Sequence, residues 1–310
     1  MIGIEKIAYY LPPGRINNLK RIDKFDVPEE FVLEKLGMKK IAIKEKNQDT
    51  SDLCLKAVAR LQEASQIELS NIDCVVVCTQ NPDARGLPHT SAIIHNKLKL
   101  AQNCAAFDIS LGCSGYVFSL SIIQSFMTAN NLKHGLLFTC DPYSKIVDSN
   151  DRSTSMLFGD AATVTVFGLN PEWVLGKAVF GSIGEKWNAI HIDANRKLRM
   201  QGRDVFNFAA RTVPDNIART LEINNIKKGD IDLYILHQAS KYIIDLLRKR
   251  LALPENKMPF CASEYGNTVS SSIPMILEGV STRNRTVLLC GFGVGLSWGS
   301  IILKRKELGD

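Results

Sequence analysis

The chain has 310 residues, of which 45% are hydrophobic and 23% charged, as in an average soluble globular protein. This balance excludes disordered, collagen-like and coiled-coil proteins. The net charge of +6 is too small for a nucleic-acid-binding protein, but it permits small anionic or acidic partners.

The sequence also indicates a compartment. It contains no run of about eighteen apolar residues, and its first residues lack the basic region and apolar run of a secretion signal. Its eight cysteines form no C-x-x-C pair and lie mostly inside apolar runs, which is typical of reduced thiols. We therefore expect a cytoplasmic protein that does not act at a membrane.

Apolar runs alternate with amphipathic segments along the whole chain, which indicates an α/β fold. The predicted strands are 4–10, 105–109, 135–139, 162–167, 286–290 and 296–303. The predicted helices are 51–64, 90–97, 115–130, 205–222, 241–251 and 271–278.

Two segments repeat the same pattern 159 residues apart. Residues 67–80 align with residues 226–239, so that Ile72-Asp73 lies on Ile231-Asp232. In each copy an amphipathic segment leads through a polar turn into a buried apolar run. We predict two duplicated halves, 1–170 and 171–310, that pack as one body.

The first chemical candidate is Cys113, in the sequence Gly-Cys-Ser-Gly after a predicted strand and before a predicted helix. A cysteine at a helix N-terminus is expected to have a lowered thiol pKa. The neighbouring Gly112 and Gly115 allow close approach of backbone and substrate. The alternative is a buried cysteine that only packs.

Among the five histidines, His237 has the most distinctive position. It ends the apolar run 233–236 and precedes a helix, and ligands in α/β sheets gather at the carboxyl ends of strands. The other four histidines have surroundings typical of surface or capping residues. His237 is therefore the candidate partner for a cysteine nucleophile.

Two further segments are glycine-rich. Asn267 lies in Tyr-Gly-Asn-Thr, where it could also simply cap a helix. Residues 291–299 carry spaced glycines whose backbone N–H groups could bind a developing oxyanion. This segment does not match a dinucleotide-binding motif, and no spacing of cysteines and histidines matches a metal site, so we expect neither a metal nor a resident cofactor.

Taken together, Cys113, His237, Asn267 and the terminal glycine segment resemble the β-ketoacyl-acyl-carrier-protein synthase III family of the thiolase superfamily, in order and spacing across nearly the whole chain. The resemblance implies a homodimer with a five-layered αβαβα thiolase-like fold. It also implies a buried active site that is reached by a pantetheine tunnel.

The activity implied by the resemblance is a decarboxylative Claisen condensation. Cys113 would accept the acyl group of an acyl-CoA, and the backbone N–H groups of Cys113 and Gly295 would form the oxyanion hole. His237 and Asn267, as neutral hydrogen-bond donors, would stabilise the enolate formed when malonyl-acyl carrier protein loses carbon dioxide. The product would be a β-ketoacyl-acyl carrier protein.

The resemblance also assigns residues to substrate binding. The implied coenzyme A and pantetheine contacts are Phe31, Lys35, Arg152, Gly202, Phe206 and Ser240. Phe31 and Lys35 replace the usual tryptophan and arginine, and a lysine lacks the planar fork of arginine. Leu87 replaces an acyl-pocket phenylalanine that reaches across the dimer. These departures leave the primer acyl group open.

The predicted helix 241–251 offers a surface for the carrier protein. Tyr242, Ile243, Leu246, Leu247 and Leu251 form its apolar stripe, which turns Lys241, Arg248, Lys249 and also Arg250 outward. In this family an acidic carrier protein is a natural partner for such a face. A merely solvated face is the alternative.

Other functions remain open at this point. A thiolase-fold acyltransferase that moves the acyl group from Cys113 to an oxygen, nitrogen or other non-malonyl nucleophile could have the same active-site residues. A thiolase is disfavoured, because it uses a second cysteine before the final glycines and a histidine where Asn267 stands. A non-catalytic partner subunit is disfavoured by the presence of all three candidate residues.

Overall fold

The computed structural model of the protein describes residues 1–306. Its strands are β1 (Gly3–Tyr10), β2 (Gly14–Asn17), β3 (Lys40–Ile43), β4 (Cys74–Cys78), β5 (Ala105–Ile109), β6 (Gly135–Cys140), β7 (Ala162–Gly168), β8 (Trp173–Ser182), β9 (Ile190–Ile192), β10 (Leu198–Met200), β11 (Leu233–Leu236), β12 (Thr286–Gly293) and β13 (Ser297–Arg305). Its α-helices are α1 (Ile22–Phe25), α2 (Thr50–Ala64), α3 (Thr90–Lys97), α4 (Gly115–Ala129), α5 (Arg152–Ser155), α6 (Gly202–Ile223), α7 (Lys241–Arg250) and α8 (Ser272–Glu278).

One nine-stranded mixed sheet runs through the molecule, in the order β11-β12-β13-β8-β1-β7-β6-β4-β5. The strands β4, β5 and β6 are parallel to one another, and β11 is parallel to β12. The register places only Ile4 of β1 opposite Trp173 of β8. This narrow junction divides the sheet into an N-terminal and a C-terminal part.

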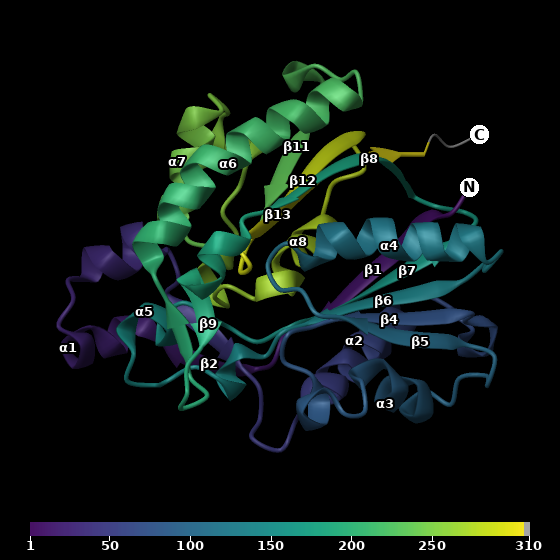
Figure 1. Ribbon diagram of the computed structural model, residues 1–310, viewed down its shortest axis with the longest axis horizontal. Coiled ribbons are helices and arrows are strands. Elements are labelled where there is room, and N and C mark those ends of the chain that lie inside the picture. The colour runs from purple at the N-terminus through teal and green to yellow at the C-terminus, as the bar shows by residue number, and fades with distance from the viewer. Residues whose placement is uncertain (307–310) are drawn as a thin grey trace.

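The two parts of the sheet are stacked with helices between and outside them (Figure 1). α4 and α8 lie between the two parts, α2 and α3 cover the outer face of the N-terminal part, and α6 and α7 cover the C-terminal part. Buried side chains of α4 and α8 share one hydrophobic cluster with strands of both parts, including Leu120, Ile273, Val76 and Leu289. The predicted five-layered αβαβα fold is confirmed.

The predicted duplication has a structural counterpart. Asp73 precedes β4, and its Oδ2 accepts hydrogen bonds from the backbone N–H groups of Lys133 (2.7 Å) and His134 (2.9 Å). Asp232 precedes β11, and its Oδ2 accepts from Arg285 (2.7 Å) and Thr286 (2.9 Å) in the same way. Each aspartate therefore links the residue before its own strand to the backbone at the start of the neighbouring strand. The boundary at 170/171 stays a prediction, and residues 307–310 of the second half lie outside the described residues.

All the predicted helices and strands given above are present, with bounds that agree to within three residues. Strand 105–109 and helix 90–97 have the predicted bounds. The largest omission is β8, which carries two internal glycines and exposes part of each face, so that its sequence shows no continuous apolar run. The short pairs β2–β3 and β9–β10 were also missed.

Among the described residues, no helix combines the length and apolar character needed to cross a membrane.

Candidate active site

Cys113 lies in the turn that leads from β5 into α4, and its side chain is 5% exposed. The last part of β12 packs directly against it. A Cβ added to Gly293 would lie 2.7 Å from Cβ and 2.8 Å from Sγ of Cys113, so any other residue at 293 would collide with the nucleophile. The predicted glycine-rich segment therefore leaves space at the sulfur.

The thiol pKa differs from the expectation based on the helix N-terminus. Burial raises the pKa of Cys113 to about 12, and the backbone N–H groups of Val294 and Cys113 lower it only in part. Loss of water on burial is the largest of these effects. The prediction of a lowered pKa was wrong, and the resting thiol needs a proton acceptor before it can attack.

His237 is placed at the end of β11, where its backbone N–H donates to the carbonyl of Cys290 (2.9 Å). Its side chain is 1% exposed, and burial lowers its pKa to about 3, so the ring is neutral at physiological pH. Nδ1 lies 2.8 Å from Oγ of Ser272, and that hydroxyl donates to the carbonyl of Val269 (2.9 Å). This contact fixes the ring with Nε2 toward Nδ2 of Asn267.

The side-chain amide of Asn267 lies close to Nε2 of His237. Its Oδ1 accepts a hydrogen bond from the backbone N–H of Val269 (2.8 Å), which fixes the side chain. Its Nδ2 lies 3.3 Å from Nε2 of His237. Nδ2 of Asn267 and Nε2 of His237 therefore converge on one place in the site, and the predicted role of both groups as hydrogen-bond donors stays a prediction.

Cys113, His237 and Asn267 line one cavity of 380 Å³. All six residues predicted to bind coenzyme A or pantetheine line it too: Phe31, Lys35, Arg152, Gly202, Phe206 and Ser240. Residues from both halves of the chain therefore converge on a single enclosed space. Its size and few polar groups are typical of a small-molecule site.

Aromatic rings and cations alternate in part of this lining. The guanidinium of Arg152 lies 5.6 Å from the ring centroid of Phe31, and Nζ of Lys35 lies 4.3 Å from that of Tyr242. The rings of Tyr242 and Phe206 are stacked with centroids 5.4 Å apart. Tyr242 was predicted to belong to the apolar stripe of its helix, but it is 43% exposed and lines the cavity.

Two predicted site residues lie elsewhere. Leu87 is 87% exposed and does not line the Cys113 cavity of its own chain. The backbone N–H of Val294, one residue before Gly295, contacts the sulfur of Cys113. The predicted oxyanion-hole N–H of Gly295 stays a prediction.

The predicted carrier-protein surface is only partly available. Nζ of Lys241 pairs with Glu34 (2.7 Å) and Asp245 (3.0 Å), and the Arg248 side chain is 16% exposed and paired with Asp245. Asp245 lies on the same helix at pairing distance from both basic residues, whereas Glu34 comes from a distant part of the chain. Lys249 is exposed, as predicted.

Asp141 is a buried residue near the site that the sequence did not single out. It follows β6, is 1% exposed, and accepts hydrogen bonds from the backbone N–H of Gln80 (2.7 Å) and Oγ of Ser270 (2.5 Å). Burial raises its pKa to about 6, and its charge contributes to the raised pKa of Cys113. Asp141 therefore connects Ser270, in the loop that carries Asn267, to Gln80, just after the end of β4.

The Asp141→Asn variant is expected to gain stability relative to the wild type as pH rises. The folded pKa lies above the ordinary value of 3.8, so the contribution of Asp141 to stability is present below pH 4 and is lost as pH passes 6. A shift of this size corresponds to about 3 kcal/mol. Urea unfolding at pH 4 and pH 7.5 measures the effect. A difference between the two proteins that does not change with pH would contradict the buried charge.

No group of three or more histidine, cysteine, aspartate or glutamate side chains within residues 1–306 is arranged to hold a metal ion. All eight cysteines are free.

Comparison with known proteins gives consistent results. The family model described as 3-oxoacyl-[acyl-carrier-protein (ACP)] synthase III matches residues 107–184, and the model of its C-terminal region matches residues 221–305. The chain is 32% identical to a β-ketoacyl-[acyl-carrier-protein] synthase III of Oceanobacillus iheyensis, with 98% of each chain covered. It is 34% identical to one of Halalkalibacterium halodurans, with 97% of this chain and 98% of the relative covered. The crystal structure of the Thermus thermophilus synthase III superposes with a TM-score of 0.91 at 29% identity, covering 98% of this chain and 99% of that chain.

Proposed function

This chain belongs to the 3-oxoacyl-acyl-carrier-protein synthase III family of condensing acyltransferases, and from that premise we propose how its own residues perform the reaction. The reaction joins the acyl group of an acyl-CoA to malonyl-acyl carrier protein through an acyl-Cys113 intermediate. The observation that carries the proposal is the convergence of Cys113, His237 and Asn267 on one cavity. Side chains and the thioesters themselves supply the chemistry, without a resident cofactor.

In the first half-reaction, Sγ of Cys113 attacks the thioester carbonyl while its proton passes to Nε2 of His237. In the resting site the two pKa values oppose this transfer, since the pKa of the Cys113 thiol is raised to about 12 and that of His237 is lowered to about 3, so the proton moves only as the new C–S bond forms. The N–H groups of Cys113 and Val294 bind the oxyanion. The C–S bond to coenzyme A then breaks, and Nε2 returns the proton to the leaving thiolate.

In the second half-reaction, malonyl thioester loses carbon dioxide, and the electron pair of the broken C–C bond forms an enolate. Nδ2 of Asn267 donates to the enolate oxygen. His237 donates as well when its proton lies on Nε2, which requires the Ser272 hydroxyl to turn from the Val269 carbonyl toward Nδ1. The enolate carbon attacks acyl-Cys113, the Cys113 thiolate leaves, and a proton restores the thiol.

Coenzyme A is the proposed acyl donor because the cavity lining has aromatic faces for an adenine and cations for phosphates. Phe31→Ala is expected to raise KM for an acyl-CoA about tenfold, because one stacking and cation–π surface is lost. The rate of Cys113 acylation at saturation should change little. The control is the matching N-acetylcysteamine thioester, which lacks the nucleotide. An equal loss with both thioesters would show that Phe31 acts on the fold and not on coenzyme A.

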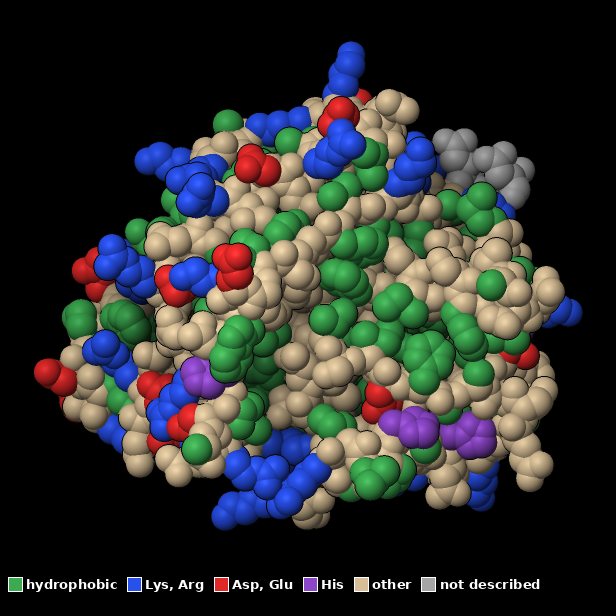
Figure 2. Space-filling model, in the orientation of Figure 1, with side chains coloured by type: hydrophobic (Ala, Val, Ile, Leu, Met, Phe, Trp, Pro, Cys, Tyr) green, Lys and Arg blue, Asp and Glu red, His purple; other side chains and the backbone are tan. Residues whose placement is uncertain are grey.

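We also propose that two copies of the chain associate through the edge strand β5, which has a neighbour on one side only in the nine-stranded sheet. Hydrophobic side chains gather over α4 and beside β5 (Figure 2), and Ile122 of α4 is 38% exposed. In such a homodimer the exposed Leu87 is available to the partner's acyl pocket. Sedimentation analysis distinguishes a dimer from a monomer of 34.4 kDa.

Two further assignments concern the carrier protein and the compartment. The exposed Lys249 of α7 supports docking of an acidic carrier protein on this side of the molecule. The eight free cysteines support a location in the reducing cytoplasm.

The experiment that tests the function is turnover of malonyl-acyl carrier protein by the acylated enzyme. Release of carbon dioxide together with β-ketoacyl-acyl carrier protein is expected. Discharge of the acyl group to an oxygen or nitrogen nucleophile, without malonyl turnover, would instead support the alternative acyltransferase.

A further inference from the structure

Tyr143 is a buried tyrosine that the proposed mechanism does not use. It opens the turn Tyr143–Lys145 after β6 and is 3% exposed, and its ring packs on Phe158 with centroids 4.7 Å apart. Its hydroxyl has no hydrogen-bond partner among residues 1–306, and it is not one of the fully buried polar atoms that lack a partner, so it keeps accessible surface in a cavity wall. In contrast, the buried Tyr116 lies 3.1 Å from Thr165 Oγ1, and Tyr234 donates to the Lys228 carbonyl (2.9 Å). The Tyr143 hydroxyl is therefore available to donate to a ligand in that cavity.

Tyr143 is close to the nucleophile. Charge on Cys113 is among the causes that raise the pKa of Tyr143, and both residues belong to one hydrophobic cluster. Tyr143 and Val294 line a second cavity of 840 Å³. Val294 also holds the backbone N–H that acts on Sγ of Cys113. Val294 therefore contacts the nucleophile and also lines the second cavity.

The proposed function directs the acyl group of a bound thioester toward this second cavity. With the thioester carbonyl at Cys113, the coenzyme A residues of the 380 Å³ cavity would hold the pantetheine arm. The acyl chain extends from the other side of that carbonyl. Ile190 lines both cavities, so they adjoin at this residue.

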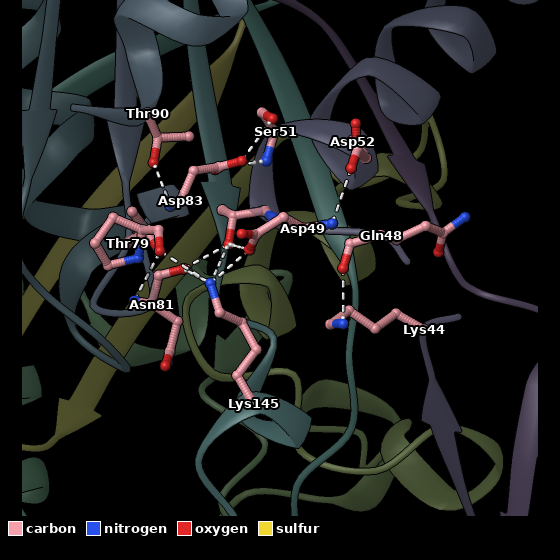
Figure 3. Close-up of polar contacts among 12 residues, drawn as sticks. Lys44, Gln48, Asp49, Ser51, Asp52, Thr79, Asn81, Asp83, Thr90 and Lys145 are labelled. Carbon is pink, nitrogen blue, oxygen red and sulfur yellow. Dashed lines mark hydrogen bonds and ion pairs between the residues drawn. The ribbon is translucent and has the colours of Figure 1, made fainter. Parts of the chain in front are cut away.

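The wall of the second cavity offers hydrogen-bond donors and positive charge. Arg85, Lys145, Arg196 and Lys197 line it, and no aspartate or glutamate is among its lining residues. Nζ of Lys145 is held by Asp49 (2.5 Å) and by the carbonyls of Asn81 (3.0 Å) and Pro82 (2.9 Å) (Figure 3). The side-chain Nδ2 of Asn81 is buried without a partner. The wall therefore suits a ligand that carries an oxygen acceptor.

We propose that Tyr143 makes the enzyme selective for primer acyl groups that carry an oxygen atom beyond the thioester carbonyl, as a hydroxyl, carbonyl or carboxylate, which accepts a hydrogen bond from the Tyr143 hydroxyl. This inference rests on the proposed function, because it requires the acyl group to be bound to Cys113. An all-carbon chain leaves the tyrosine hydroxyl without a partner, and a buried polar group that loses its partner discriminates strongly between substrates.

The test compares three four-carbon acyl-CoAs: butyryl-CoA, 3-hydroxybutyryl-CoA and succinyl-CoA. The rate of Cys113 acylation is followed by intact-protein mass. The wild type is expected to prefer at least one oxygenated thioester over butyryl-CoA by about tenfold or more. In Tyr143→Phe this preference should fall to less than about threefold, because the hydrogen-bond donor is lost while the ring keeps its packing on Phe158.

A matched control is Tyr116→Phe, which removes another buried hydroxyl in a different hydrophobic cluster. It should keep the wild-type preference. The proposal is overturned if the wild type shows no preference for either oxygenated thioester, or if the preference survives in Tyr143→Phe. No acylation by any of the three thioesters would contradict the proposed function itself and this proposal with it.

Discussion

Replacement of Cys113 by alanine is expected to abolish condensation while leaving decarboxylation of malonyl thioester measurable. The condensation rate should fall at least about ten-thousand-fold, because no other group in the cavity forms the acyl intermediate. In the proposed mechanism decarboxylation depends on Asn267 and His237, whose contacts with Val269 and Ser272 do not involve the sulfur. Carbon dioxide release from malonyl-acyl carrier protein and formation of β-ketoacyl product are measured in parallel.

The variant tests the mechanism because it is expected to lose condensation but to keep decarboxylation. If Cys113→Ala still forms β-ketoacyl product, the acyl-cysteine intermediate is wrong. If it loses both reactions while its unfolding midpoint is that of the wild type, the assignment of decarboxylation to Asn267 and His237 is wrong.

Asn267→Ala is expected to have the complementary effect. Condensation should fall about a hundred- to a thousand-fold, because the enolate loses a fixed and buried donor. Acylation of Cys113 by an acyl-CoA should fall less than about tenfold, because Nε2 of His237 still accepts the thiol proton. Single-turnover kinetics of each half-reaction, followed by intact-protein mass, separate the two rates.

The acylation rate also serves as the internal control for folding, because it requires Cys113 and His237 to be correctly placed. An equal fall in both half-reactions would mean that Asn267 positions the site and does not act on the enolate.

The three central residues could be predicted from the sequence because each lies where a strand or turn fixes its position. Cys113 follows β5 and precedes α4, and His237 ends β11, so local patterns place both at carboxyl ends of strands. The resemblance to a known family then identified residues 31, 35, 152, 202, 206 and 240, which the structure brings into the same cavity.

Burial and long-range contacts account for what the sequence did not predict. The pKa of Cys113 depends on how completely the site excludes water, and this is set by β12 folding back from the other half of the chain. The pairing of Lys241 with Glu34 joins residues 207 positions apart. Asp141 and Tyr143 follow β6 without a glycine or a motif, so their place beside Cys113 is visible only in three dimensions.

The measurement that tests the central claim most directly is the intact mass of the wild-type protein, first after mixing with a panel of acyl-CoAs and then after addition of malonyl-acyl carrier protein. The account predicts a single acyl adduct on the peptide that contains Cys113. It also predicts loss of that adduct as carbon dioxide and β-ketoacyl-acyl carrier protein form. An adduct that persists with malonyl-acyl carrier protein but is discharged by another nucleophile would contradict it.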